Sequence, residues 1–234
     1  MWRIGIDEAG RGPVIGPLVV GALRVKESDL AMMHEVGITD SKLLSHEKRV
    51  ELDAWIRKQG WDFELQVSDP AEIDRAMMAT NLNDHEVSLF AALARKLRVE
   101  GEGILQLDAC DSDASRFGNN VASRIDWPWR GWTMDSRHAA DLHCLAVAGA
   151  SILAKVERDR IIRELGESLG IDIGSGYPSD PKTIAALQHL IVDEEPHDCL
   201  RWRWKTVTEA WHLQHGTQVP NRPPGPQSAQ RTLF

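Results

Sequence analysis

The residues with the clearest potential for chemistry stand near the start of the chain, where a short apolar run leads directly into two acids. This stretch reads Gly5-Ile6-Asp7-Glu8-Ala9-Gly10-Arg11-Gly12. In an extended strand Ile6 faces one side of a sheet, and Asp7 faces the other side together with Gly5. Burying an ionised carboxylate costs free energy unless it is paired or binds a metal. Asp7 and Glu8 are therefore candidate metal ligands, although a lone aspartate at a strand end is more often structural.

The glycines that follow these acids predict a loop that approaches a ligand closely. Gly10 and Gly12 tolerate a positive φ and leave room for close approach to the backbone. Arg11 between them can face a phosphate. An ordinary tight turn is the alternative. The stretch is not a nucleotide-binding P-loop, because no Gly-Lys-Ser/Thr follows at the required spacing.

Two more acids follow apolar patterns later in the chain. Asp108 directly ends the apolar run Ile104–Leu107, and Asp141 stands where a long helical pattern begins. Asp108 lies near Asp111 and Asp113, so this run could instead be a solvated acidic loop, in which a neighbour is mistaken for the ligand. An aspartate at a helix start is also a common N-cap. Asp108 is preferred to its neighbours because it ends the strand.

The elements that must position these acids can be read from hydrophobic periodicity and from turn residues. Three early strands predict an antiparallel meander, and a long helix from near Asp141 carries small residues that let it pack closely on a sheet. The predicted strands are Trp2–Asp7, Leu18–Val25, Trp61–Val67, Ile104–Leu107 and Trp132–Asp135. The other predicted helices are Ser45–Gln59, Ala71–Met78, Asp84–Val99, Ala114–Ile125, Thr183–Asp193 and Lys205–His215. We expect a catalytic domain over residues 1–170, a helical C-terminal region over 171–215, and a disordered tail over 216–234, which is rich in Pro, Gly, Gln and Ser.

Composition favours a globular cytoplasmic protein. Of 234 residues, 42% are hydrophobic and 26% are charged, and no apolar run approaches the roughly 18 residues of a membrane helix. Cys110, Cys144 and Cys199 are scattered, which predicts inert thiols. A net charge of −8, taken alone, argues against binding nucleic acid. Local clusters of Lys and Arg weaken that objection. Part of the negative charge also belongs to candidate metal ligands, and bound divalent ions would offset it.

The opening motif Gly-x-Asp-Glu-Ala-Gly-Arg-Gly-Pro-x-x-Gly-Pro resembles the signature of type 2 ribonucleases H, also called ribonuclease HII. The resemblance continues in order over roughly residues 3 to 206. It is carried by Asp40-Ser41-Lys42, Leu107-Asp108-Ala109, His138-Ala139-Ala140-Asp141, the helical stretch from Ala150 to Arg160, and an archaeal-like loop from Gly174 to Pro181. One position departs from the pattern: Ala139 stands where the family has a lysine.

The resemblance implies a ribonuclease H-like α/β fold, with a mixed five-stranded sheet flanked by helices and a small helical C-terminal appendage. It implies that Asp7, Glu8, Asp108 and Asp141 form a catalytic quartet that binds two Mg²⁺ or Mn²⁺ ions roughly 4 Å apart. The expected activity is endonucleolytic hydrolysis of the RNA strand in RNA–DNA hybrids, and cleavage 5′ to ribonucleotides embedded in duplex DNA. The expected products carry a 5′-phosphate and a 3′-hydroxyl, and the expected state is a monomer.

The resemblance also suggests which residues bind the substrate. In the family, the backbone of the Gly10-Arg11-Gly12 segment reads the ribose 2′-hydroxyl, the group that distinguishes RNA from DNA. Tyr177, the single tyrosine of the chain, corresponds to a residue that stacks near the RNA–DNA junction, although a tyrosine there could simply anchor a turn. The phosphate path would be lined by Lys42, Lys155, Arg158 and Arg160, for which a solvated helix face is the alternative.

Two further segments leave alternatives open. Arg201-Trp202-Arg203-Trp204-Lys205 interleaves basic and aromatic residues, which suits single-stranded nucleic acid but equally suits tryptophans that dock on the core. The last residues, Gln230-Arg231-Thr232-Leu233-Phe234, resemble the first part of a sliding-clamp-binding peptide with an incomplete aromatic pair. The rival functions are a nuclease of the same fold that acts on DNA alone, and a clamp-tethered binding module without catalysis. The four retained acids argue against the second rival.

Overall fold

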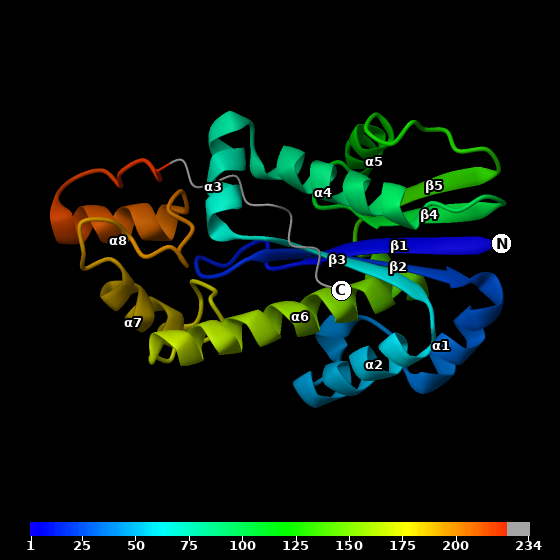
Figure 1. Cartoon of the computed structure of the whole chain (residues 1–234), viewed down its shortest axis with the longest axis horizontal. Helices are drawn as coiled ribbons and strands as arrows, with labels where there is room; N and C mark the ends of the chain where they lie inside the picture. Colours follow the sequence, from blue (N-terminus) through cyan, green and yellow to red (C-terminus); the bar gives the residue numbers. More distant parts are fainter. Residues whose placement is uncertain (224–234) are drawn as a thin grey trace. The chain divides into compact units, whose positions relative to one another are not determined.

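The computed structural model describes residues 1–223, and Figure 1 shows its elements. Its contacts divide the chain into two compact units, each built from separated segments. The first unit contains Met1–Ala9, Val19–Gln66 and Asn83–Val156, and the second contains Gly10–Leu18, Val67–Leu82 and the chain from Glu157 onward. The predicted domain limits at residues 170 and 215 stay predictions.

A mixed five-stranded sheet forms the centre of the first unit. Its strands are β1 (Trp2–Ala9), β2 (Leu18–Lys26), β3 (Asp62–Ser68), β4 (Gly103–Asp108) and β5 (Trp132–Arg137). They lie in the order β3-β2-β1-β4-β5. β1 pairs with β2 antiparallel and with β4 parallel, and β4 pairs with β5 parallel. The predicted fold class is confirmed, and β1 and β4 end at the same edge of the sheet because they are parallel.

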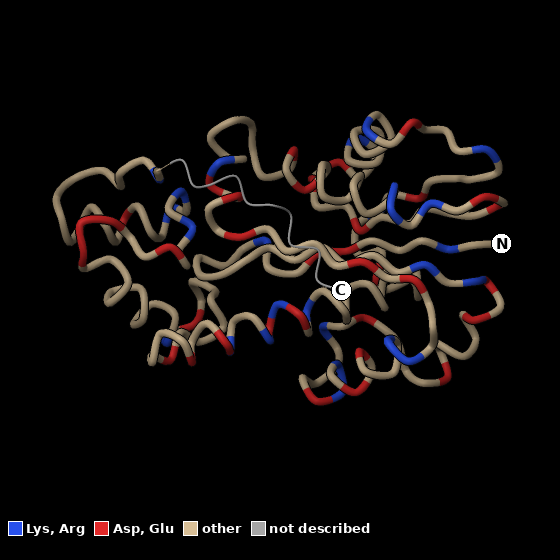
Figure 2. The backbone as a smooth tube through the Cα atoms, viewed as in Figure 1, with Lys and Arg blue, Asp and Glu red and all other residues tan. Residues whose placement is uncertain are grey.

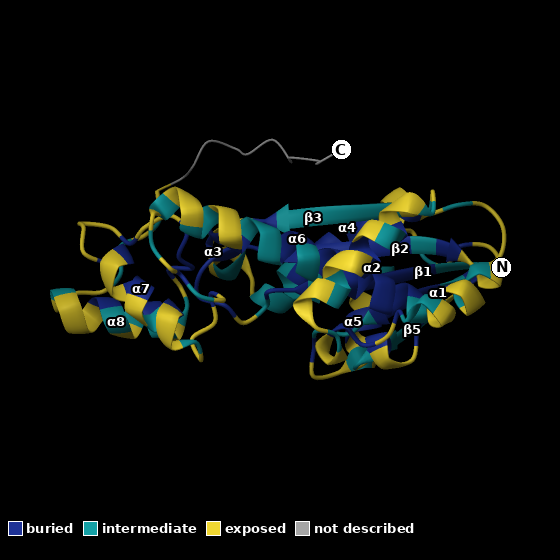
Figure 3. Ribbon diagram, turned by 90° about the horizontal axis from the view of Figure 1, so that it is seen from below, coloured by how far each residue is buried: buried dark blue, intermediate teal, exposed yellow. Residues whose placement is uncertain are grey.

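Helices cover both faces of this sheet (Figure 1). One face carries α1 (Leu30–Val36), α2 (His46–Lys58) and the first part of α6 (Leu145–Leu169), and the other carries α4 (Leu82–Leu97) and α5 (Ala114–Ala122). On the first face Leu23 and Val25 of β2 join a buried cluster with α1, α2 and α6. On the second, the rings of Phe90 and Phe117 meet edge to face with centroids 5.1 Å apart. Figure 3 shows that β1 and β2 are buried while the outer sides of the helices are exposed. The sequence did not predict α1.

Helix α6 packs on β1 with no space for a side chain between them. A Cβ atom added at Gly5 would fall inside contact distance of backbone atoms of Ala146 and Val147. A Cβ at Gly21 of β2 would lie 2.5 Å from the carbonyl oxygen of Ala150. The predicted close packing of the small-residue helix is therefore present, and it brings α6 against the strand that carries Asp7.

The second unit is mainly helical. Its helices are α3 (Pro70–Ala79), α7 (Pro181–Leu190) and α8 (Lys205–His215), together with the last part of α6. Asp69 and Glu72 form a reciprocal capping box at the start of α3. Val14, Ile15 and Trp202 belong to the core of this unit, and Ile15 forms an isolated antiparallel bridge with Leu200.

Three predicted helix boundaries are wrong by three residues or more. Helix α6 begins at Leu145, and Asp141 lies before it in a 3₁₀ turn, Ala140–Leu142, that follows Ala139 in a left-handed conformation. The N-cap interpretation of Asp141 therefore fails, because its carboxylate lies inside a separate turn. Helix α7 ends at Leu190 rather than at Asp193, and α5 ends at Ala122 rather than at Ile125. None of the helices within residues 1–223 is long and apolar enough to span a lipid bilayer.

Candidate active site

Three of the four predicted catalytic acids meet at the edge of the sheet where β1 and β4 end. Asp7 and Glu8 belong to β1, and Asp108 is the last residue of β4. One carboxylate oxygen from each lies within 4.8 Å of the other two. Asp7 is only 4% exposed and its carboxylate accepts a hydrogen bond from the Glu8 amide at 2.7 Å. The parallel pairing of β1 with β4 brings these residues together from distant parts of the sequence.

Asp141 is positioned by the turn that precedes α6. It is 3% exposed, and neither of its carboxylate oxygens has a hydrogen-bond partner within the described residues. The ammonium of Lys42 lies 3.8 Å away. The turn itself is fixed to the first three acids, because the amide of Ala140 donates to Asp108 at 2.9 Å. A buried carboxylate with two unsatisfied oxygens is an energetic liability in the metal-free protein.

The surroundings of this cluster raise the pKa values of three of its acids. Burial, and then the neighbouring charge of Glu8, raise the pKa of Asp7 well above its ordinary value. Burial and the charge of Asp7 raise the pKa of Asp108 to about 6. Burial also raises the pKa of Asp141, which the charge of Lys42 opposes. Carboxylate oxygens are the ligands that hard divalent cations prefer, so these residues fit a Mg²⁺ or Mn²⁺ site.

A chain of hydroxyl groups connects the cluster to Lys155. Ser151 of α6 hydrogen-bonds to Asp7, and its hydroxyl lies 2.9 Å from that of Ser41. The ammonium of Lys155 donates to Ser41, and burial lowers the pKa of Lys155. Burial opposes protonation of Lys42 as well, but the carboxylates around it, with Asp141 foremost, raise its pKa. Nothing in the sequence pattern identifies Ser151 as a partner of Asp7.

The acids that could be confused with Asp108 have structural partners. Asp111 forms an ion pair with Arg116, which holds the pKa of Asp111 well below its usual range. Asp113 caps α5 by accepting from the amide of Arg116. The geometry therefore favours Asp108 over both neighbours as a ligand.

Two neighbours of Glu8 were not recognised in the sequence. Cys110, predicted to be inert, donates its thiol to Glu8 at 3.2 Å. Glu86 of α4 is fully buried, and its carboxylate belongs to a group with Glu8 and Cys110 whose donor atoms lie within 4.8 Å of one another. A glutamate four residues before the buried Phe90, on the apolar face of its helix, was the available signal for Glu86.

The raised pKa of Asp108 predicts how the metal-free protein responds to pH. The folded protein keeps a proton that the unfolded chain releases, so this contribution to stability is complete below about pH 4 and is lost as the pH rises through about 6. We expect the thermal unfolding midpoint in EDTA to fall between about pH 5 and about pH 7.5. The fall should be smaller in Asp108→Asn, and Mg²⁺ or Mn²⁺ should stabilise the wild type more at the higher pH. Equal pH dependence in the two proteins would contradict this origin.

The predicted substrate-binding glycines lie in the second unit. Gly10 has a φ of 90°, and a Cβ there would lie 2.5 Å from the Nε of Arg158. A Cβ at Gly12 would lie 3.6 Å from the ring of Tyr177, which is partly exposed. The guanidinium of Arg158 lies 5.0 Å from the centre of that ring and donates to the carbonyl of Ser175 at 3.0 Å. Arg158 is buried, so it supports this loop from within.

The remaining basic candidates lie in segments that contact other parts of the protein. Arg160 forms ion pairs with Glu157 and Glu164 along α6, as expected for a solvated helix face. Of the open alternatives for residues 201–205, core docking is the one that the structure supports, because Trp202 is buried in the core of the second unit. Basic and acidic residues are interspersed along the described chain (Figure 2), so the net charge of −8 is not confined to one segment.

Comparisons with known proteins agree with one another. The family model described as Ribonuclease HII matches residues 4–207. A curated relative, the ribonuclease HII of Methanocella arvoryzae, is 46% identical over 205 residues, which cover 87% of this chain and 88% of that protein. The solved ribonuclease H2 from Pyrococcus horikoshii OT3 superimposes with a TM-score of 0.82 at 32% identity, covering 93% of this chain and 100% of that chain. The Archaeoglobus fulgidus ribonuclease HII, solved in complex with PCNA, gives 0.77 at 38% identity and covers 89% of this chain and 96% of that chain.

Proposed function

The chain belongs to the ribonuclease HII family of metal-dependent endonucleases, which have ribonuclease H activity on RNA–DNA hybrids, and from this premise we propose its specific reaction. It hydrolyses the RNA strand of hybrids and cuts 5′ to ribonucleotides embedded in duplex DNA, leaving a 5′-phosphate and a 3′-hydroxyl. The observation that carries this proposal is the convergence of Asp7, Glu8 and Asp108 within 4.8 Å, at the edge of the sheet.

In this proposal Asp7, Glu8, Asp108 and Asp141 hold two divalent cations, either Mg²⁺ or Mn²⁺. Such ions activate a water molecule and stabilise the leaving oxygen of a phosphodiester. Asp108 also fixes the turn that carries Asp141, through the amide of Ala140. Lys42, which is exposed and close to Asp141, is placed to contact a substrate phosphate. Lys155 holds Ser41 by a hydrogen bond. Ser41 contacts Ser151, which hydrogen-bonds to Asp7, so Lys155 helps to position the carboxylate of Asp7.

Recognition of the ribonucleotide is assigned to the second unit. The backbone of Gly10, Arg11 and Gly12 reads the 2′-hydroxyl, and the exposed ring of Tyr177 stacks beside the nucleotide. Arg158 supports Tyr177 from behind. Ala139, which replaces the family lysine, removes one basic contact without removing an acid.

Cleavage mapping tests this proposal directly. A labelled DNA duplex carrying one ribonucleotide, a long RNA–DNA hybrid and an all-DNA duplex are each incubated with Mg²⁺, Mn²⁺ or EDTA. We expect a metal-dependent cut on the 5′ side of the ribonucleotide and no cut in the all-DNA duplex. Cleavage of the all-DNA duplex would favour a DNA nuclease of the same fold. Binding without any cleavage would favour the non-catalytic module.

We also propose that the protein acts as a monomer and that residues Gln230–Phe234 bind a sliding clamp. These residues lie outside those that the structure describes. The support is their sequence and the relative from Archaeoglobus fulgidus that was solved with PCNA.

Deletion of Gln230–Phe234 is expected to abolish association with the clamp, because it removes the glutamine, leucine and aromatic anchors together. Surface plasmon resonance with immobilised clamp measures this. Cleavage of the ribonucleotide-containing duplex without clamp serves as the control and should be unchanged. Clamp binding that survives the deletion would remove this part of the proposal.

A further inference from the structure

A buried arginine lies beneath the loop that is proposed to read the ribose. Arg201 is 0% exposed, and each hydrogen bond of its guanidinium goes to a backbone carbonyl of this loop. Its Nη2 donates to Gly10 at 2.6 Å, its Nη1 to Arg11 at 2.9 Å, and its Nε to Gly16 at 3.0 Å. One side chain therefore fixes three peptide groups between Gly10 and Gly16.

The direction of these carbonyls decides the direction of the neighbouring amides. A peptide group is planar and trans, so its C=O and its N–H point in opposite directions. The carbonyls of Gly10 and Arg11 point toward Arg201, and the N–H groups of Arg11 and Gly12 therefore point away from it. These two N–H groups lie in the segment proposed to read the 2′-hydroxyl, whose oxygen can accept a hydrogen bond from them.

The loop is held on other sides as well. The indole Nε1 of Trp204 donates to the carbonyl of Gly12 at 3.3 Å, and the amide of Val14 donates to the carbonyl of Gly176 at 2.8 Å. Gly176 directly precedes Tyr177. The amide of Arg201 itself donates to the carbonyl of Val14 at 2.9 Å. The same set of contacts thus fixes the backbone of the loop and the base of Tyr177.

Arg201 also has an unusual electrostatic environment. Burial, followed by repulsion from Arg158, lowers the pKa of Arg201 to about 9, and none of its direct partners is a carboxylate. A buried charge is costly, although the charge of the nearby Asp74 favours the protonated guanidinium. Its cost is offset here by carbonyl dipoles, which leaves a positive charge beneath a loop proposed to contact a nucleic acid.

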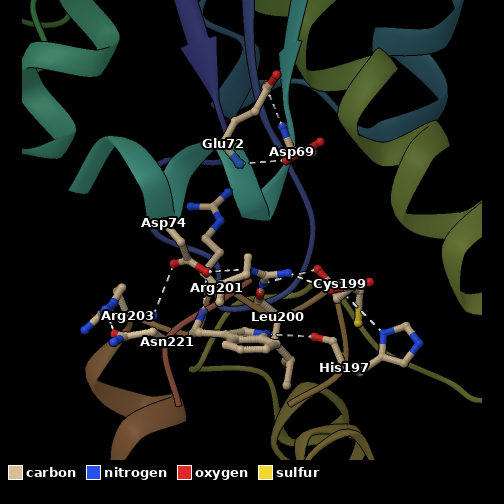
Figure 4. Close-up of polar contacts among 12 residues, drawn as sticks. Asp69, Glu72, Asp74, His197, Cys199, Leu200, Arg201, Arg203 and Asn221 are labelled. Carbon is tan, nitrogen blue, oxygen red and sulfur yellow. Dashed lines mark hydrogen bonds and ion pairs between the residues drawn. The ribbon is translucent and has the colours of Figure 1, made fainter. Parts of the chain in front are cut away.

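The segment that carries Arg201 is itself anchored. Asp74 of α3 is 1% exposed and accepts from the amides of Trp202 at 2.9 Å and Arg203 at 3.2 Å. Figure 4 shows the carboxylate of Asp74 facing this backbone. The side chain of Arg222 donates to Asp74 at 3.1 Å and stacks on Trp202. Arg201 is thus presented to the loop from a fixed base.

We propose that Arg201 is a positioning residue for ribose recognition, which orients the amides of Arg11 and Gly12 toward the 2′-hydroxyl by holding the carbonyls on their other side. The inference rests on the proposed function, since it concerns how that substrate is distinguished from DNA. Lysine cannot replace arginine in this role, because an ammonium group lacks the planar fork that reaches three carbonyls at once.

The test compares Arg201→Lys with Arg203→Lys, a matched control two residues away whose guanidinium donates to the side chain of Asn221. Equilibrium dissociation constants are measured in EDTA for a duplex with one ribonucleotide and for the same all-DNA duplex. We expect the wild type and Arg203→Lys to prefer the ribonucleotide duplex. Arg201→Lys should lose about tenfold of this preference, the loss of one to two hydrogen bonds, with its affinity for all-DNA duplex unchanged.

Trp204→Phe provides a second variant if Arg201→Lys does not fold. It removes the hydrogen bond to Gly12 and keeps the ring, so it should lower the preference in the same direction by a smaller factor. An unchanged preference in whichever of the two variants folds, or equal affinity of the wild type for both duplexes, would overturn the inference. Cleavage of the ribonucleotide duplex by the wild type, assayed separately with Mg²⁺, keeps these outcomes distinct from failure of the proposed function.

Discussion

Asp7→Asn is expected to lower the cleavage rate on a duplex with one ribonucleotide by at least about 10³-fold, equivalent to about 4 kcal/mol of transition-state stabilisation. The neutral amide keeps the shape of the side chain but removes the charge that would bind a cation. Asp7 is the most buried of the three converging acids, so water cannot take its place easily. Rates are measured under single-turnover conditions with Mg²⁺ and with Mn²⁺.

Asp113→Asn is the matched control for this prediction. Asp113 lies near Asp108 in the sequence but caps α5, and asparagine is an equally good N-cap. Its cleavage rate should stay within about twofold of wild type, within the small effects expected of surface substitutions. Asp7→Asn should also unfold at a higher temperature than wild type in EDTA, because a buried carboxylate and its repulsion from Glu8 have been removed. An Asp7→Asn protein that cuts at the wild-type rate would refute the assignment.

Gly5→Ala is expected to destabilise the fold by about 3 kcal/mol, at the upper end of the effects of overpacking. The added methyl group would overlap backbone atoms of Ala146 and Val147, and backbone cannot move aside as a flexible side chain can. Helix α6 must shift away from β1, which also separates Ser151 from Asp7. Urea denaturation monitored by tryptophan fluorescence measures the free energy of unfolding.

Gly60→Ala is the comparison for Gly5→Ala. A Cβ atom at Gly60 meets nothing within 4 Å, but its φ of 71° gives a side chain a cost of about 1 kcal/mol. A Gly5→Ala protein no less stable than Gly60→Ala would mean that the β1–α6 contact is not as tight as described.

The sheet and the three converging acids could be predicted because local patterns specify them. Alternation in β1 places Asp7 on the face of Gly5, and the apolar run of β4 stops at Asp108. Parallel strands that end together bring both acids to one edge. The resemblance to type 2 ribonucleases H already implied that these acids act together. Hydrophobic periodicity placed the start of α2 at Ser45, which is the N-cap of this helix, one residue before its first residue, His46.

The parts that could not be predicted depend on tertiary contacts. Asp141 leaves the expected helix because Ala139 adopts a left-handed conformation and the next turn is tied to Asp108. In the sequence, the segment of Arg201 suited a nucleic-acid contact and docking on the core equally, since nothing local indicates that three carbonyls from a distant part of the chain surround this side chain. Glu86 and Ser151 likewise could not be identified as site residues from the sequence, because their contacts with Glu8 and Asp7 of β1 exist only in the folded chain.

The parallel pairing of β1 with β4 has a consequence for how the enzyme folds during its synthesis. It joins Ile6 to Leu107, so the long segment between them must be closed into a loop, at a cost in chain entropy, before the pairing can stabilise the fold. Such non-local contacts form slowly. On the ribosome, β1 and β2 emerge early and can pair with each other, but the partner of Asp7 in β4 is made much later. A growing chain therefore contains Asp7 and Glu8 before Asp108 has been synthesised, so its site is incomplete. Cleavage activity should appear only after β1 and β4 have paired.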